Sequence, residues 1–347
     1  RKWIKKFKTI EDTFKQRAAE EDIDSKFPFD NIKWLVEEGY SVLTLPKSYG
    51  GEGATIEDMV VLQSYLGAID GATALSIGWH LSVVGQLYQQ HMWSQTMLDQ
   101  FAIEVKNGAL VNRAVSEADT GSPTRGGSPA THAIKTKDGY KLNGVKTFTS
   151  MSKALTHYIV AAFVEDIQEV GFFLIPRETK GLEIADNWNM LGMRATESHA
   201  LVLNDVIGPF ENFVETKHKP QPNGWILHIP SVYLGIAQAA RDYAIEFAKT
   251  HSPNSIEGTI ATLPTVQQNV GKMESLLLSA RHFLWSTAKG YNQYNETLNI
   301  WNETSASKIL VMNQGLEVVD LAMRIVGAKS LEMDRPLPVS YTHLRAH

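Results

Sequence analysis

A first candidate for chemistry in this 347-residue chain is the stretch AVSEADTGSP, residues 114–123. Small residues such as Gly121 let backbone N–H groups approach oxygen acceptors closely, and the hydroxyls of Ser116 and Ser122 can donate or accept hydrogen bonds. Such a stretch can cradle a phosphate-bearing cofactor. Taken alone, it more often indicates a solvated turn, because the same residue types dominate turns.

Residue types and charge exclude or disfavour several other kinds of site. The chain has no cysteine, which excludes disulfides, thiolate metal sites and cysteine nucleophiles. Its 11 histidines are scattered and form no H-E-x-x-H pattern, which argues against a metal-dependent hydrolase. YGGEGA follows no predicted strand and is not G-x-G-x-x-G, which argues against a Rossmann dinucleotide site. A net charge of −5 argues against non-specific nucleic-acid binding.

The bulk composition is that of a globular protein. Hydrophobic residues make up 43 % and charged residues 20 % of the chain. No uninterrupted apolar run approaches the roughly 20 residues that a membrane span requires. The basic N-terminus has no apolar core of a signal peptide. We therefore expect a cytoplasmic protein without a membrane span.

Residues 1–108 are predicted to form a helical domain. Apolar side chains recur at steps of three and four from Trp3 to Phe14, as a helix that buries one stripe requires. Gly39 stands where a helix C-cap belongs, and Thr55 with Asp58 resembles a capping box. These signals place two further helices around the turn-rich connector LPKSYGGEGA.

The periodicity then changes to two, which predicts a middle β domain over 109–215. Asp138-Gly139 and Asn143-Gly144 are hairpin signals, and HYIVAAFVED, VGFFLIP and SHALVLNDVI are predicted strands. Helical periodicity resumes after the joint KHKPQPNGW, which predicts a C-terminal helical bundle over 222–337. Residues 338–347 fit no helical pattern or cap, and VSYTHLRAH resembles a translated sequencing adapter, so we expect a non-native tail there.

The α, β, α order and five motifs together resemble the acyl-CoA dehydrogenase family. The motifs are LPKSYGGEGATIED, AVSEADTGSP, NGVKTFTS, NMLGMRATESHALVLNDV and GIAQAARD, spread over about 45–330. The resemblance implies an N-terminal helical domain, a middle β-barrel-like domain and a C-terminal helical bundle. In the fourth motif, Arg194 and Thr196 are predicted to fix a loop rather than to take part in chemistry.

The resemblance also implies a bound flavin. By position, Val115, Ser116, Gly121 and Ser122 match the loop that binds the flavin's pyrimidine edge, with Ser122 also near the substrate. Phe148, Thr149 and Ser150 match the segment whose aromatic ring covers one face of the isoalloxazine and whose polar groups reach N5. Without this context, Phe148 would be taken as an inward-facing strand residue.

MRIVGAKS resembles the family's glycine loop, which meets the flavin pyrophosphate of a neighbouring subunit. Gly327 matches the first glycine of that loop. Arg324 stands where many members have glutamine, and it can pair with the pyrophosphate or form an ordinary surface ion pair. The resemblance thus implies FAD and a homo-oligomer, a tetramer or a dimer.

The implied reaction is α,β-dehydrogenation of an acyl-CoA to an enoyl-CoA, with electrons passed to electron-transfer flavoprotein. Most members use a glutamate base whose place lies past His347, and a minority place it on a helix that is NGWILHIPSVYL here, without a carboxylate. His228 in that helix is predicted to be a packed core residue. The catalytic base is therefore unassigned.

Two alternatives stay open at this point. Flavin monooxygenases share the fold, use FMN supplied by a flavin reductase, and need no glutamate; FTS and YLGIAQAA resemble them as well as the dehydrogenases. A non-catalytic flavin-fold binding protein is the other. The dehydrogenase is preferred because its class is larger.

Overall fold

The computed structural model describes residues 2–121, 127–216, 221–293 and 300–345. The first part is helical, as the sequence predicts. Trp3, Phe7 and Phe14 are buried along one face of the first helix, and Thr55 with Asp58 forms a capping box at the start of the third. The N-terminal helices are α1 (Lys2–Asp24), α2 (Phe29–Glu37), α3 (Ile56–Ile69), α4 (Gly71–Gln89) and α5 (Gln95–Lys106).

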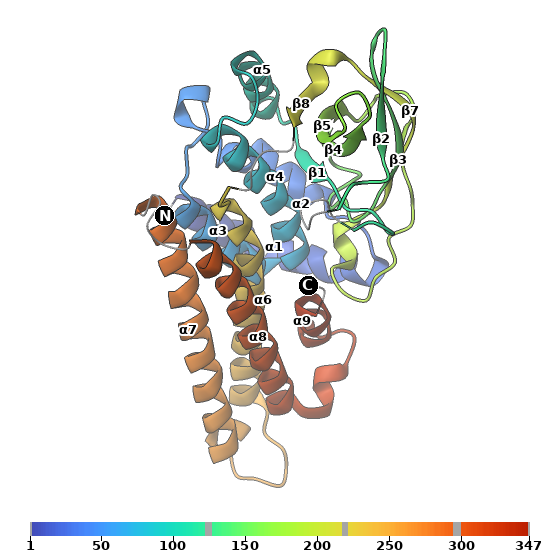
Figure 1. Cartoon of the computed structure of the whole chain (residues 1–347). Coiled ribbons are helices and arrows are strands. Elements are labelled where there is room, and N and C mark those ends of the chain that lie inside the picture. The colour runs from blue at the N-terminus through green and yellow to red at the C-terminus, as the bar shows by residue number, and fades with distance from the viewer. Residues whose placement is uncertain (1, 122–126, 217–220, 294–299, 346–347) are drawn as a thin grey trace.

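The middle of the chain forms one eight-stranded mixed sheet among the described residues (Figure 1). The strand order is β6-β7-β3-β2-β4-β5-β8, and β1 pairs in parallel with β4. The strands are β1 (Val111–Ala114), β2 (His132–Thr136), β3 (Gly139–Lys146), β4 (His157–Val164), β5 (Glu169–Pro176), β6 (Leu182–Ile184), β7 (Leu201–Gly208) and β8 (Phe213–Thr216).

One of the two predicted hairpin turns is confirmed. β2 and β3 pair in antiparallel fashion across the turn before Gly139. The prediction of a second turn at Asn143-Gly144 is wrong, because these residues lie inside β3, where the register with β7 shifts as in a bulge. Gly144 has a φ of +154°, and a Cβ there would lie 2.3 Å from the Thr131 hydroxyl. A glycine is therefore required here because Thr131, just before β2, lies too close to β3 for a side chain at position 144.

The C-terminal helices run side by side and extend away from the sheet (Figure 1). They are α6 (His228–Thr250), α7 (Pro264–Gln293) and α8 (Ile300–Val326), followed by η8 (Gly327–Leu331) and α9 (Pro336–Leu344). Most of the final segment, expected to fit no helical pattern, is thus helical, with Leu337 and Leu344 buried. Among the described residues, no helix is long and apolar enough to cross a membrane.

The N-terminal and C-terminal helices share one core. α3 packs along α6 so closely that glycines are required on both helices. A Cβ on Gly235 would lie 2.1 Å from the Ser64 carbonyl oxygen, and one on Gly67 would lie 2.6 Å from the Val232 carbonyl oxygen. The first and last thirds of the chain therefore form a single support for the sheet.

Three side-chain contacts fix the sheet on this support. Arg194, before β7, donates to Asp22 of α1 at 2.6 Å, as expected of a residue that fixes its loop. Glu215 of β8 accepts from Arg113 of β1 and from the indole of Trp93. The buried His80 of α4 lies beneath the start of β1. These contacts therefore hold the loop before β7, β8 and β1 against α1, the segment between α4 and α5, and α4 itself.

His80 is locked in its neutral form. Its Nδ1 accepts from the Val111 N–H at 3.1 Å, so its Nε2 donates to the Ser41 carbonyl at 2.9 Å. Burial lowers the pKa of His80 from 6.5 to about 4, against the opposing effect of the Ser41 hydrogen bond. Protonation would remove the acceptor that holds β1.

We expect His80 to make folding sensitive to acid. Because its folded pKa lies below its unfolded pKa, the contribution to stability is complete above pH 6.5 and is lost as the pH falls toward 4. The loss over that interval is about 3 kcal/mol. Urea unfolding at pH 7 and pH 4 should show a smaller difference for His80→Gln than for the wild type. Equal differences in the two proteins would contradict this assignment.

Candidate flavin site

The candidate site is built where two strands end. β1 ends at Ala114 and leads into residues 115–121, and β3 ends at Lys146 and leads into residues 147–150. The two segments are joined directly, because the Thr147 N–H donates to the Ser116 carbonyl at 2.8 Å. Two stretches that lie about 30 residues apart in sequence thus form one surface.

A third segment, residues 193–199, supports this surface from behind. The Thr149 N–H donates to the His199 carbonyl and the Met151 N–H to the Thr196 carbonyl. The hydroxyl of Ser198 lies 2.9 Å from that of the buried Ser150 and 2.8 Å from that of Thr196. These bonds fix the backbone of residues 149–151.

The side chain of Phe148 projects away from this hydrogen-bonded backbone. Its φ is +56°, which is uncommon for a bulky residue and persists only where the surroundings enforce it. The side chain is 59 % exposed, and its one described ring contact is edge-on to Trp188, at 5.9 Å between centroids. A face of the Phe148 ring is therefore available to a flat ligand.

Two hydroxyls beside Phe148 lack partners. The Oγ1 atoms of Thr147 and Thr149 are buried and have no hydrogen-bond partner among the described residues. Buried hydroxyls are normally satisfied, so these two, next to an exposed aromatic ring, are candidates for hydrogen bonds to the polar group of a ligand. Donors, acceptors and an aromatic face at one place fit a flavin, whose flat ring has a polar edge.

Comparisons with known proteins identify the family of this chain. Family models of the acyl-CoA dehydrogenase N-terminal, middle and C-terminal domains match residues 5–92, 112–206 and 227–347. A Bacillus subtilis protein provisionally named acyl-CoA dehydrogenase YdbM is 50 % identical, over 100 % of this chain and 92 % of its own. The chain belongs to the acyl-CoA dehydrogenase family.

Solved structures of an acyl-CoA dehydrogenase and of a monooxygenase share the fold along nearly the whole chain. Butyryl-CoA dehydrogenase from Megasphaera elsdenii matches with a TM-score of 0.83 and 19 % identity, over 97 % of this chain and 92 % of its own. Dibenzothiophene monooxygenase TdsC from Paenibacillus sp. A11-2 matches with a TM-score of 0.86 and 17 % identity, over 100 % and 92 %. The predicted fold class is confirmed. Membership of the family places this chain among the flavin oxidoreductases.

The structure brings most of the predicted site residues of this acyl-CoA dehydrogenase family member together. Val115, Ser116 and Gly121 lie on the first segment, and Phe148, Thr149 and Ser150 lie on the second. Gly121 is exposed with a φ of +69°, and a Cβ there would meet no atom within 4 Å. Ser122 lies outside the described residues. The roles of these residues in flavin binding remain predictions.

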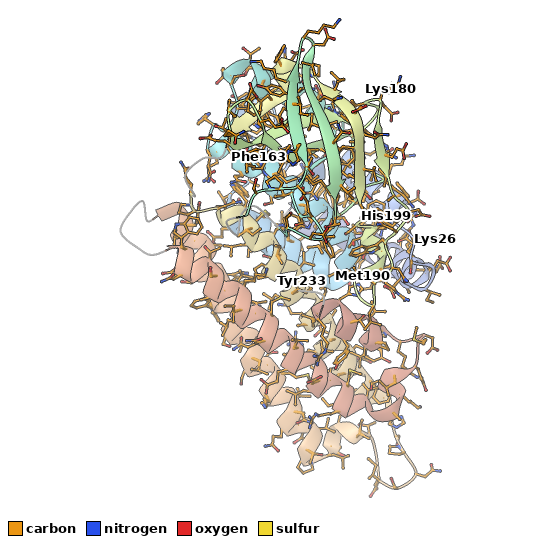
Figure 2. All side chains as sticks on the ribbon, turned by 45° about the vertical axis from the view of Figure 1, so that its right-hand side comes forward. Lys26, Phe163, Lys180, Met190, His199 and Tyr233 are labelled. Atoms are coloured by element: carbon orange, nitrogen blue, oxygen red, sulfur yellow. The ribbon has the colours of Figure 1, made fainter. Side chains whose placement is uncertain are left out.

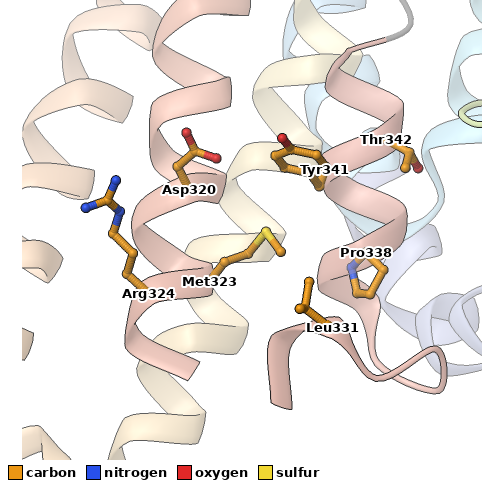
Figure 3. Close-up of a pocket in the computed structure, with 7 residues that line it drawn as sticks. All are labelled: Asp320, Met323, Arg324, Leu331, Pro338, Tyr341 and Thr342. Atoms are coloured by element: carbon orange, nitrogen blue, oxygen red, sulfur yellow. The ribbon is translucent and has the colours of Figure 1, made fainter. Parts of the chain in front are cut away.

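Arg324 and Gly327 are not part of this cluster. They lie where α8 ends, and that end of α8 points away from the sheet (Figure 1). Arg324 lines an open hollow of about 520 Å³ there, with Asp320 and Met323 on the same helix and Leu331, Pro338, Tyr341 and Thr342 opposite (Figure 3). If these residues contact flavin, that flavin belongs to another subunit, as the family resemblance implies.

The part of α6 where a minority of the family carry their glutamate is apolar or neutral in this chain. Trp225, just before α6, is buried and donates from its indole to Gln89. His228 is buried edge-on against Trp79, as predicted for a core histidine. A hollow of about 160 Å³ nearby is lined by Ile226, Leu227, Pro230, Thr304, Ser305 and Lys308. Residues 224–234 include no carboxylate.

His199 is a residue of the site that the sequence did not reveal. Its Nδ1 accepts from the N–H groups of Asn187 and Trp188, which places its proton on Nε2. Burial, and then the charge of Lys153, lowers the pKa of His199. Figure 2 shows His199 and Met190 where the sheet meets the helices. A neutral His199 thus fixes the loop that places Trp188 against Phe148.

Among the described residues, no group of three or more histidine, aspartate or glutamate side chains could hold a metal ion.

Proposed function

We propose that this protein is an FAD-dependent acyl-CoA dehydrogenase that converts an acyl thioester to its α,β-unsaturated form. The observation that supports this best is the cluster of Phe148, Thr147 and Thr149 just after β3, joined by a backbone hydrogen bond to the segment that follows β1, in a chain 50 % identical to the provisional dehydrogenase YdbM. When bound, FAD would supply the two-electron acceptor for the substrate.

The chain's own residues would bind and orient the cofactor. Phe148 would cover one face of the ring, and the hydroxyls of Thr147 and Thr149 would satisfy its polar edge. The first segment, from Val115 to Gly121, would line the pyrimidine side. Electron-transfer flavoprotein as acceptor and a homotetramer are part of this proposal.

One observation favours a second function, flavin-dependent monooxygenation. Residues 224–234 include Trp225, Ile226 and His228 and no carboxylate, so this part of the chain offers no base for removing an α-proton. A monooxygenase using reduced FMN and O₂ needs no such base. It would oxygenate a neutral substrate that fits against apolar side chains such as those of Trp225 and Ile226.

An anaerobic titration separates the two functions. The purified protein is loaded with FAD or FMN and mixed with a panel of acyl-CoA thioesters without oxygen. A dehydrogenase should lose its visible flavin absorbance with at least one thioester, and the enoyl-CoA should appear by mass spectrometry. A chain that binds flavin but is bleached by no thioester of the panel would overturn the dehydrogenase proposal.

A protein that binds neither FAD nor FMN would contradict both functions. It would leave only the non-catalytic interpretation.

A further inference from the structure

Glu117 is a buried acid at the base of the candidate flavin site. It follows Ser116, and its carboxylate accepts five hydrogen bonds from the described residues, at both ends of the loop that leads to β2 and at the end of β3. Oε1 accepts from the Lys146 ammonium at 2.6 Å, the Thr131 hydroxyl at 2.6 Å and the Thr131 N–H at 3.0 Å. Oε2 accepts from the Thr120 hydroxyl at 2.7 Å and the Ala130 N–H at 2.6 Å.

The charge of this acid is balanced inside the protein. The side chains of Glu117 and Lys146 are 4 % and 0 % exposed. Burial would raise the pKa of Glu117, but the hydrogen bonds from Lys146, Thr120, Thr131 and the Ala130 amide outweigh it and hold the pKa at about 2. Burial lowers the pKa of Lys146, and the hydrogen bond to Glu117 and the Glu117 charge oppose that effect. Glu117 is therefore ionised beside the Lys146 ammonium, and a buried carboxylate with this many donors is geometrically well defined.

The pair connects the two segments of the candidate flavin site, residues 115–121 and 147–150, which together are called the flavin cradle. Lys146 is the last residue of β3 and stands two positions before Phe148, and Glu117 stands one position after Ser116. The neighbouring backbone bond, from Thr147 to Ser116, runs between the same two segments. One ion pair therefore sets the spacing between the exposed aromatic ring and the loop of small residues.

We propose that Glu117 and Lys146 are positioning residues that preform the flavin cradle before the flavin binds. This inference rests on the proposed flavin site but not on which reaction the flavin performs. The two residues have different tasks. Glu117 closes the loop onto Ala130 and Thr131, and Lys146 ties that closed loop to the segment that carries Phe148.

The first test needs no flavin. In hydrogen exchange of the flavin-free protein, the amides of Ala130 and Thr131 should be protected, because both donate to the carboxylate. Glu117→Gln should speed their exchange by about 10-fold or more, because a hydrogen bond to a charged acceptor is lost or weakened. Lys146→Met should change it little, because Glu117 keeps its other donors.

The second test measures flavin binding by folded protein. FAD and FMN are titrated separately, well below the unfolding temperature, and the fluorescence is followed. Lys146→Met should lower the affinity for the better-bound flavin by about 10- to 100-fold. Without the ion pair, the spacing between the two segments is no longer set in advance and must form when the flavin binds. The matched control is Lys141→Met, on the same strand, where Lys141 forms an exposed ion pair with Asp205. It should bind flavin like the wild type.

A double variant separates positioning from stability. Glu117→Gln alone leaves the Lys146 charge buried without its partner and should lower the unfolding temperature strongly. Adding Lys146→Met removes that charge and should restore much of the unfolding temperature. Flavin affinity should stay low, because the link between the two segments is still absent.

The outcomes are distinguishable. If wild type binds flavin and Lys146→Met binds it equally well, the positioning role is wrong and the proposed function stands. Recovery of flavin affinity together with stability in the double variant would reduce the pair to a structural contact and overturn the inference. If the wild type binds no flavin, the proposed function fails, and with it the inference.

Discussion

Replacing Glu215 with leucine is expected to lower the free energy of unfolding by about 3 to 5 kcal/mol. The Glu215 side chain is 1 % exposed and accepts two bonds from the Arg113 guanidinium, at 2.9 and 3.1 Å, and one from the Trp93 indole at 2.7 Å. Removing the carboxylate leaves the largely buried Arg113 without its counter-charge, and the Trp93 N–H without its acceptor. The cost is therefore that of an uncompensated buried charge.

Urea unfolding followed by circular dichroism measures this loss. The matched control is Glu183→Leu on β6, where the side chain is exposed, and it should change the free energy by no more than about 0.5 kcal/mol. Because Trp93 follows α4 and Glu215 lies in β8, the variant should also loosen the contact between helices and sheet. A Glu215→Leu protein that unfolds at the wild-type urea concentration would refute this account.

Gly235→Ala should destabilise the protein by about 3 kcal/mol or more, although alanine is the better helix former. The added methyl would lie 2.1 Å from the Ser64 carbonyl oxygen and 2.7 Å from the Ala68 nitrogen. Both atoms belong to the backbone of α3 and cannot move aside as a side chain can. The two helices would have to separate along the shared core.

A glycine elsewhere in the bundle provides the control, with an effect of opposite sign. Gly271 lies within α7, and a Cβ there would meet no atom within 4 Å. Gly271→Ala should therefore raise the free energy of unfolding by about 0.5 to 1 kcal/mol through helix propensity alone. Thermal unfolding of the two variants should shift in opposite directions. A stabilised Gly235→Ala would show that the close helix contact is absent in solution.

Local patterns in the sequence predicted the elements well where one short-range signal decided them. The capping box at Thr55 and the left-handed Gly39 after α2 are both as expected. Asn143-Gly144 was misjudged because a glycine with positive φ serves a turn and a bulge equally well. Only the pairing of β3 with β7, about 60 residues away, distinguishes the two.

The candidate site could be predicted in part. AVSEADTGSP and FTS pointed to these two segments only together with the other family motifs, because small and hydroxyl-bearing residues alone more often indicate a turn. Nothing in the sequence showed that Glu117 contacts Lys146. The two residues lie 29 positions apart, and charged side chains usually face solvent. His199 is kept neutral by two backbone amides that donate to its Nδ1, and the positions of these amides follow only from the folded chain.

The shared core of α3 and α6 has a consequence for how the protein is made. Residues 56–69 complete their packing only against residues 228–250. On the ribosome, the N-terminal helices emerge early and must wait with an unpaired apolar face until the C-terminal half is synthesised. The sheet, whose strands lie between Val111 and Thr216, is contiguous and can pair its strands first. Chaperones that cover exposed apolar helices should therefore act on the nascent chain during that interval.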